Sequence, residues 1–431
     1  MSTPARSLQP ETSQTLPLTL RLARTAMLSR LAGLRGELVL HDALGSTRLG
    51  QHDPSPDAPA AVVVHVRDPE FYRHVALNGS VGAGEAYMDG LWTCTDLVAL
   101  IRLLVRNRDL LDAMEGGSAR VAGWLLRAWH GLRRNTHSGA RRNIAAHYDL
   151  GNPLFRLFLD ENLMYSSAIF ASQDELLEVA AERKLARICE KLDLRSSDHV
   201  VEIGTGWGGF ALYAARRHGC HVTTTTISRE QFELAQARVA SAGLDDRVTV
   251  LFADYRTLRG RFDKLVSIEM VEAIGHQYLK TYFKKCADLL KPSGLAVIQA
   301  ITIEDQRYQQ ALRSVDFIKR HIFPGSFIPC VSALVGSAAR HTDLRLINLE
   351  DIGASYALTL QHWRQRFLEQ REAVRALGYD HRFMRMWEFY LAYCEGGFIE
   401  RSIGNVQLLF ARPDNRRGQF SPPIAQHAGA Q

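Results

Sequence analysis

Residues 199–218 read HVVEIGTGWGGFALYAARRH, and this stretch decides the fold. It opens with an apolar run typical of a buried strand, and its second half has the composition of a helix. Between them, Gly204, Gly206, Gly208 and Gly209 permit a tight turn and let a ligand approach the free N–H groups of the following helix. The stretch therefore predicts a strand, a glycine-rich ligand loop and a helix in succession.

Strands and helices continue to alternate on both sides of this loop. A capping box at Ser172 and Glu175 predicts a helix that runs through Leu192. Further strands are predicted at 221–227, 247–254, 262–270 and 294–302, with helices at 229–242 and 278–290. Such alternation indicates right-handed crossovers and an α/β, doubly wound, mostly parallel sheet covered by helices on both faces. After two helical patterns at 357–377 and 381–394, a late strand at 405–412 fits an antiparallel edge.

The chain is long enough for more than one hydrophobic core. Its 431 residues and 48.3 kDa predict two domains. Short strands at 36–40, 46–50 and 60–68 and helices at 68–79 and 95–114 predict a small N-terminal α+β domain. We expect a disordered tail at 1–17, this small domain at 18–115, a basic linker at 116–142, a catalytic domain at 143–415 and a flexible tail at 416–431.

Composition excludes several classes of protein. The hydrophobic fraction of 46% rules out a mainly disordered or fibrous chain. The net charge, 52 − 46 = +6, permits an anionic partner without naming one, and nothing in it predicts nucleic-acid binding. The six cysteines form no CxxC pair, which predicts reduced thiols in the cytoplasm and no metal site.

The segment 120–142 stands apart because it holds six Arg and no acid, together with Trp124 and Trp129. Such a segment fits either a basic amphipathic helix in a lipid headgroup region or a solvated interdomain linker.

Acidic residues near the glycine loop bear on which ligand it takes. Glu202 precedes the first glycine, and the second strand ends in Thr226-Ile227-Ser228, without the acid that a dinucleotide ribose requires. Asp254-Tyr255 ends the third strand, where an adenine amine could be bound. These features favour S-adenosylmethionine over NAD, while a tight turn with no ligand is the alternative.

Several motifs resemble the cyclopropane-fatty-acid synthase family, and above all its plant and actinobacterial type. They include HYDLGNPLFRLFLDENLMYSSAIF (147–170), IEMVEAIGH (268–276), DFIKRHIFPGSFIP (316–329) and FYLAYCEGGF (389–398). The resemblance covers 143–410, and residues 78–92 look like the small lipid-facing domain of membrane-acting members. It implies a Rossmann-like class I S-adenosylmethionine methyltransferase fold and alkylation of double bonds in acyl chains.

The resemblance also implies the site residues. Those for the cofactor are Tyr165, Ser166, the loop Glu202–Gly209 with Trp207, Thr226, Ile227, Ser228, Gln231, Asp254 and Tyr255. Glu272, Tyr356 and the backbone near Ile301 would hold a bicarbonate ion, and Cys394 matches a cysteine assigned to the active site. Ser167 and Gln299 stand where the family has Cys and, in its enterobacterial type, His. Both keep hydrogen-bond donors, so an anion could still bind.

The implied reaction is attack of a cis double bond in a membrane phospholipid on the sulfonium methyl, which leaves a carbocation on the acyl chain. Aromatic walls such as Tyr356 would protect this cation from water. Deprotonation by bound bicarbonate would then give a cyclopropane fatty acid. Two alternatives are a methylene or methyl-branched chain from the same transfer, and a non-catalytic lipid-binding relative. The resemblance further implies peripheral association with the inner face of the membrane and a homodimer.

Overall fold

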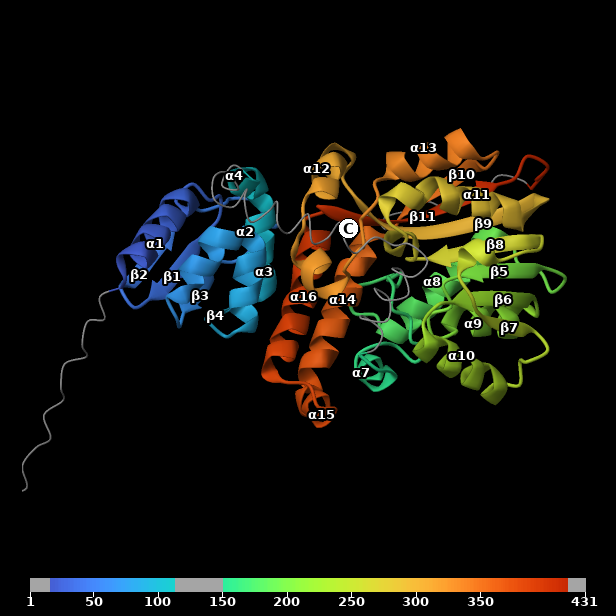
Figure 1. Cartoon of the computed structure of the whole chain (residues 1–431), viewed down its shortest axis with the longest axis horizontal. Helices are drawn as coiled ribbons and strands as arrows, with labels where there is room; N and C mark the ends of the chain where they lie inside the picture. Colours follow the sequence, from blue (N-terminus) through green and yellow to red (C-terminus); the bar gives the residue numbers. More distant parts are fainter. Residues whose placement is uncertain (1–15, 113–149, 418–431) are drawn as a thin grey trace, which may run out of the picture. The chain divides into compact units, whose positions relative to one another are not determined.

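The computed structural model describes residues 16–112 and 150–417, which form two compact units, one from each range (Figure 1). The predicted basic linker and the Arg- and Trp-containing segment 120–142 lie outside these residues, as do most of the two predicted tails. No helix within the two ranges is long and apolar enough to cross a bilayer.

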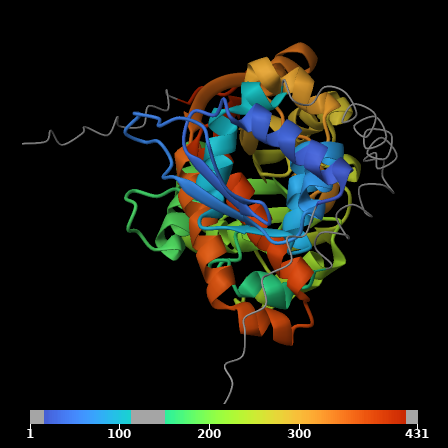
Figure 2. The ribbon, with the colours of Figure 1, turned by 90° about the vertical axis from the view of Figure 1, so that its left-hand side faces the viewer.

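The N-terminal unit is a four-stranded sheet beside helices, seen in blue in Figures 1 and 2. Its sheet order is β2-β1-β3-β4, with β1 antiparallel to β2 and parallel to β3. Its elements are α1 (Leu18–Leu31), β1 (Leu38–Asp42), β2 (Gly45–Leu49), β3 (Val62–Val66), α2 (Glu70–Met88), β4 (Trp92–Cys94), α3 (Leu97–Arg106) and α4 (Arg108–Asp112). The small α+β domain is thereby confirmed, although the sequence did not reveal α1 or β4.

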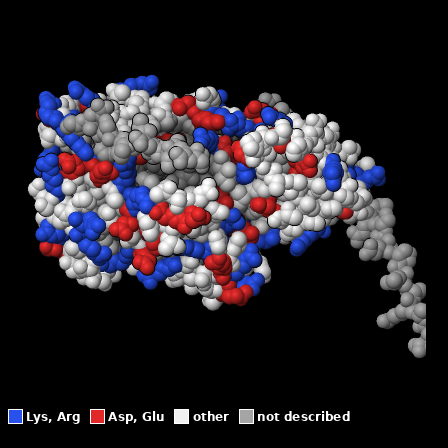
Figure 3. All heavy atoms as spheres, turned by 180° about the vertical axis from the view of Figure 1, so that it is seen from behind, with Lys and Arg blue, Asp and Glu red and all other residues white. Residues whose placement is uncertain are grey.

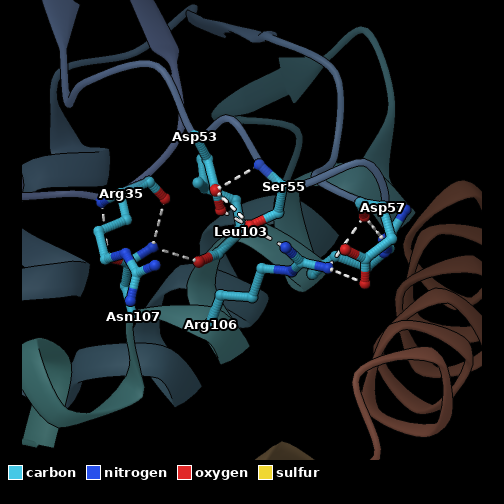
Figure 4. Close-up of polar contacts among 8 residues, drawn as sticks. Arg35, Asp53, Ser55, Asp57, Leu103, Arg106 and Asn107 are labelled. Carbon is cyan, nitrogen blue, oxygen red and sulfur yellow. Dashed lines mark hydrogen bonds and ion pairs between the residues drawn. The ribbon is translucent and has the colours of Figure 1, made fainter.

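Polar contacts tie the loop between β2 and β3 to helix α3 (Figure 4). Arg106 donates to the carboxylate of Asp57 at 2.7 Å and lies 3.4 Å from that of Asp53. At the end of α3, the buried side chain of Asn107 accepts from the N–H of Arg35 and donates to the carbonyls of Arg35 and Leu103. The contacts of Arg106 thus hold the β2–β3 loop to α3, and those of Asn107 hold the chain before β1.

The second unit holds a seven-stranded sheet in the order β10-β11-β9-β8-β5-β6-β7. Its strands are β5 (His199–Ile203), β6 (His221–Thr226), β7 (Val248–Phe252), β8 (Phe262–Ile268), β9 (Leu290–Ile303), β10 (Arg345–Asp351) and β11 (Ile403–Ala411). Its helices are α7 (Asn152–Arg156), α8 (Leu177–Leu192), α9 (Gly209–His218), α10 (Arg229–Ser241), α11 (Leu279–Leu289), α12 (Tyr308–Arg313), α13 (Val331–His341), α14 (Gly353–Glu369), α15 (Arg371–Ala376) and α16 (His381–Ile399).

Strands β5 to β9 pair in parallel, as the alternating pattern predicts. Strand β11 is antiparallel, but it lies between β9 and β10 rather than at the edge where the sequence placed it. The edge is β10, whose residues RLINLED mix charged and apolar side chains and are half exposed. That weak pattern carries little strand signal, which is why the sequence did not reveal this element.

Helices cover both faces of the sheet. Val200 on β5 packs with residues of α8, α9 and α10, while its neighbour Val201 packs with residues of α11 and α13. This alternation is the two-sided core of a doubly wound sheet. Helices α14 and α16 lie side by side next to the sheet (Figure 1).

Helix α8 begins later than the capping box predicts. Its first residue is Leu177, and Glu175 accepts instead from the N–H of Ala171 and pairs with Arg183. The predicted box is therefore wrong, and the predicted end at Leu192 is confirmed.

Candidate active site

The glycine loop joins the carboxyl end of β5 to the start of α9. Gly204, Gly206 and Gly208 have φ of +101°, +52° and +85°, in the region that favours glycine. A Cβ at Gly206 would meet nothing within 4 Å, so the backbone conformation, and not crowding by the protein, requires glycine there. At Gly209 a Cβ would come within 2.4 Å of the Met164 sulfur.

Two ionisable groups are buried beneath this loop. Glu202 is 2% exposed, and burial raises the pKa of its carboxyl to about 8. Its Oε2 has no hydrogen-bond partner among the described residues. Lys184 on α8 is fully buried and donates to Ser166 Oγ at 2.8 Å, and burial lowers its pKa to about 8. An unpartnered acceptor beside a positive-φ glycine loop fits a ligand that brings its own donors, such as the ammonium and hydroxyl groups of S-adenosylmethionine.

The predicted segment 226–231 forms the turn between β6 and α10, and Ile227 lies within it. Ser228 caps α10 by accepting from the N–H of Gln231 at 3.3 Å, and Thr226 donates to the Gln231 side-chain oxygen at 2.9 Å. Gln231 is thus held in place at the end of the strand next to the loop.

The remaining predicted cofactor residues differ in where their side chains point. Asp254 lies at the carboxyl edge of the sheet and pairs with Arg256 at 2.6 Å. Tyr255 packs in the core against α11, and Trp207 is buried and donates to Asn152 at 2.6 Å. Because the side chains of Tyr255 and Trp207 are occupied in this way, we expect only their backbone groups to contact the cofactor. The Tyr165 hydroxyl is hydrogen-bonded to that of Tyr390 at 2.9 Å.

A carboxylate that the sequence did not single out lies at the centre of the predicted catalytic residues. Glu269 follows β8, and its Oε1 accepts from the Ser167 N–H at 2.9 Å, from Gln299 Nε2 at 2.8 Å and from Asn405 Nδ2 at 2.6 Å. Its Oε2 accepts from the Tyr356 hydroxyl at 2.7 Å. Three of the five groups predicted to surround bicarbonate thus donate to a side chain of the protein itself.

Glu272 lies one turn further along the chain, in a 3₁₀ segment at Val271–Ala273. Its Oε1 accepts from the Ile301 N–H at 2.5 Å, and its buried Oε2 has no partner among the described residues. Burial, together with the nearby charge of Glu269, raises the pKa of this carboxyl to about 8. The structure therefore brings Glu272 and Ile301 together, and Glu272 is mainly protonated at neutral pH.

Aromatic rings border the two carboxyl groups. The ring of Tyr356 lies 4.4 Å from that of Phe398 and 6.1 Å from that of Trp363. Trp363 is in turn 5.2 Å from Tyr165. Such faces stabilise a nearby cation and offer no nucleophile to it.

Cys394 lies on α16 in the same region. Burial raises the pKa of its thiol well above the usual range, so the thiol stays protonated. A protonated thiol is a poor nucleophile or base. The geometry thus gives Cys394 no role that requires a thiolate.

The sequence analysis missed Glu269, Asn405 and Lys184. The motif IEMVEAIGH contains two acids, Glu269 and Glu272, three residues apart. A single sequence does not indicate which of them accepts the hydrogen bonds of Ser167, Gln299 and Tyr356. Lys184 lies in a helix with many charges, where a Lys ordinarily indicates a solvated face.

The model of the family described as mycolic acid cyclopropane synthetase matches residues 135–408. The chain is 38% identical over 365 residues to tuberculostearic acid methyltransferase UfaA1 of Mycobacterium tuberculosis, covering 82% of each chain. It is 36% identical over 357 residues to cyclopropane-fatty-acyl-phospholipid synthase of Escherichia coli, covering 82% of this chain and 88% of that one.

Among solved structures, mycolic acid cyclopropane synthase CmaA1, complexed with SAH and CTAB, is similar with a TM-score of 0.59 and 26% identity. The similarity covers 63% of this chain and 98% of that one. It confirms the predicted class I methyltransferase fold for the second unit.

Proposed function

Since the chain belongs to the mycolic acid cyclopropane synthetase family, we propose that it methylates a double bond in a phospholipid acyl chain to give a methylene product, which a separate reductase can convert to a methyl branch. Family membership makes the chain an S-adenosylmethionine-dependent fatty-acid methyltransferase, and the non-catalytic alternative is set aside. The proposal goes further by naming the substrate and the product.

The observation that carries the proposal is the 38% identity to a tuberculostearic acid methyltransferase across 82% of both chains. The name of that relative refers to a branched fatty acid rather than to a ring. Formation of a cyclopropane, which the family resemblance implies, is the second candidate product. It is supported by the 36% identity of this chain to a cyclopropane-fatty-acyl-phospholipid synthase. That name also supports a phospholipid acyl chain as the substrate.

The loop Glu202–Gly209 and the turn from Thr226 to Gln231 would hold S-adenosylmethionine at the carboxyl edge of the sheet. When bound, it supplies an electrophilic methyl group, and its sulfur keeps the electrons of the broken carbon–sulfur bond. The π electrons of the alkene form the new carbon–carbon bond, and the neighbouring carbon becomes a cation. The rings of Tyr356, Trp363 and Phe398 would stabilise this cation and exclude water.

Loss of a proton decides the product. If a hydride first shifts from the methylated carbon to the cationic carbon, loss of a methyl proton gives a methylene branch on the open chain. Without that shift, loss of the same proton closes a three-membered ring. Reduction of the methylene to a methyl branch needs a hydride donor and belongs to a separate reductase.

The sequence analysis predicts bicarbonate as the base for this step. The contacts of Glu269 favour a carboxylate of the protein, because Ser167, Gln299 and Tyr356 already donate to it.

We also propose that the enzyme meets its substrate as a peripheral protein on the cytoplasmic face of a membrane. Support comes from the substrate class, from the Arg-rich segment 120–142, and from Leu18 and Leu22 of α1, which are 70% and 62% exposed. A homodimer stays a prediction from the family resemblance.

Product analysis tests the proposal. The protein would be expressed in cells that make cis-unsaturated phospholipids and lack such an enzyme. The masses of the fatty acid methyl esters from their lipids would be measured by mass spectrometry before and after mild hydrogenation. A gain of one CH₂, followed by a gain of one H₂ on hydrogenation, supports a methylene. A product that gains CH₂ and resists hydrogenation supports the ring. Unchanged lipids, from cells in which the folded protein binds S-adenosylmethionine, would contradict both.

A further inference from the structure

We propose that Glu269 is the resident base of this site, taking the proton that the sequence analysis assigned to bicarbonate, so that the enzyme needs no dissolved anion. This inference rests on the proposed methyl transfer and names the group that completes it.

Four hydrogen-bond donors converge on the Glu269 carboxylate, and together they form a cradle that suits an anion. Its carboxylate accepts four hydrogen bonds of 2.6 to 2.9 Å, from one backbone N–H, two amides and one phenol. The four donors belong to Ser167, Gln299, Tyr356 and Asn405, all of which are buried. Converging buried donors stabilise a negative charge, since an uncharged acceptor would leave them poorly satisfied.

The orientation of the Gln299 amide is itself fixed. Gln407 donates to the Gln299 side-chain oxygen at 3.0 Å, which turns the NH₂ group toward Glu269. Both glutamines are buried on adjacent strands, β9 and β11, where they lie directly opposite each other. Two of the four donors to Glu269, Gln299 and Asn405, are therefore held by paired strands of the sheet.

The two oxygens of Glu269 are not equivalent. A carboxylate has about four lone-pair positions in all, two on each oxygen. Among the described residues, Oε1 accepts from three donors, whereas Oε2 accepts from Tyr356 alone. Oε2 therefore retains an open acceptor position, next to the ring that would face the cation.

Glu272 does not compete for this role. Its carboxyl is mainly protonated at neutral pH, and its Oε1 accepts from the Ile301 N–H. The geometry thus gives the role of base to Glu269, whose carboxylate accepts four hydrogen bonds. A protonated Glu272 can donate a hydrogen bond, and its buried Oε2 has no partner among the described residues. Both properties suit a positioning residue that holds a water molecule near the base.

The backbone at Glu269 has a φ of +48°, which is uncommon for a residue with a side chain. Strained backbone of this kind persists where the surrounding contacts over-determine it, and it is concentrated at functional sites. Glycine adopts this conformation without strain. A Glu269→Gly variant would therefore keep the local fold and empty the cradle.

In the proposed step, Oε2 accepts a proton from the new methyl group, and the electrons of that C–H bond form the product's new carbon–carbon bond. The proton then passes to solvent, so the carboxylate is regenerated with no oxidant or reductant.

The test is anion rescue. Wild type, Glu269→Gly and Glu269→Gln would be assayed with unsaturated phospholipid vesicles and S-adenosylmethionine, in degassed buffer with and without bicarbonate. Wild type should turn over equally in both buffers. Without bicarbonate, both variants should lose turnover by roughly 100-fold or more, the scale of a lost general base. Bicarbonate should restore Glu269→Gly at least about tenfold, because it can enter the emptied cradle, but not Glu269→Gln, whose amide still fills it.

Each variant would first be shown to bind S-adenosylhomocysteine and to keep its melting temperature. Glu372→Gln, which changes an 84% exposed carboxylate on α15, is the matched control and should behave as wild type. A wild type that requires bicarbonate would overturn the inference and leave the proposed methyl transfer standing. Full activity of Glu269→Gln would also overturn it. A wild type that methylates no lipid in either buffer would contradict the proposed function itself.

Discussion

At Glu272, burial and a neighbouring negative charge act in the same direction. Both disfavour the ionised carboxyl, and the pKa of about 8 lies well above that of an unfolded chain. The folded state therefore binds a proton that the unfolded state has lost between about pH 4.5 and pH 8. Across that window the wild type loses stability as the pH rises.

Glu272→Gln removes this titration while keeping an oxygen that can accept from Ile301. We expect the variant to gain stability relative to wild type as the pH rises, by about 2–4 kcal/mol in total between pH 5 and pH 8. Urea unfolding at several pH values measures the difference, which should level off above pH 8. A difference that does not change with pH would show that Glu272 ionises normally. Glu202, whose pKa is also raised, is present in both proteins and cancels in the comparison.

Gly206 offers a second prediction at this scale. Gly206→Val should fold, because no protein atom lies within 4 Å of the added Cβ, at a cost of about 1–2 kcal/mol for the left-handed backbone. It should abolish S-adenosylmethionine binding in calorimetry, since the side chain enters the space where the ligand approaches the loop.

Gly243→Val is the matched control for backbone strain. Gly243 has a φ of +63° and equally open surroundings, but it lies beyond the end of α10. This variant should lose similar stability and bind the ligand normally. Tight binding by Gly206→Val would remove the loop from the cofactor site.

Single residues also mark the limit of sequence reasoning. Glu202, Gly206 and Glu272 could be identified because the strand-end pattern or a family motif places them. Glu269 and Asn405 could not, since their meeting depends on β11 entering the sheet beside β9. The contact between Glu269 and Asn405 joins residues that are 136 apart in the chain.

Among the elements, the parallel strands were predictable because each is a short apolar run between turn signals. The antiparallel part was not fully predictable. Strand β11 was expected, but its position depends on β10, whose alternation of half-exposed side chains carries little signal. An edge strand buries little of its surface, so its sequence is weakly constrained.

The junction of α3 with the chain before β1 gives a prediction for the N-terminal unit (Figure 4). Asn107→Ala should destabilise this unit by about 1–3 kcal/mol, because the buried carbonyl of Leu103 and the backbone N–H and carbonyl of Arg35 lose their partner. Limited proteolysis near α3 and thermal unfolding would measure the loss.

Asn78→Ala, on α2 of the same unit, is the control. Asn78 is half-buried and has no part in this junction, so the substitution should change the free energy of unfolding by no more than about 0.5 kcal/mol. Equal effects of the two substitutions would show that the Asn107 contacts add nothing specific.

At the scale of the whole molecule, charge does not gather into a single patch on the described surface seen in Figure 3, where Lys and Arg lie among Asp and Glu. Attraction to an anionic membrane should then depend on the acid-free segment 120–142. Each Arg near such a surface contributes about 1 kcal/mol, within a Debye length of about 10 Å.

We therefore predict cosedimentation with anionic vesicles that weakens as salt is added. Binding should weaken further when Arg133, Arg134, Arg141 and Arg142 become Gln. A salt-insensitive part should fall in a Leu18→Ser, Leu22→Ser variant, because these exposed side chains would insert into the lipid. Equal binding to neutral and anionic vesicles at every salt concentration would show that the segment is only a linker.

The left-handed backbone at Glu269 has one more consequence. If the base is carried by the chain, membrane remodelling does not depend on how much carbon dioxide the surroundings dissolve. A single codon change to glycine would make the lipid composition of a cell respond to that gas. On this proposal, the residue at position 269 decides whether the reaction depends on dissolved carbon dioxide.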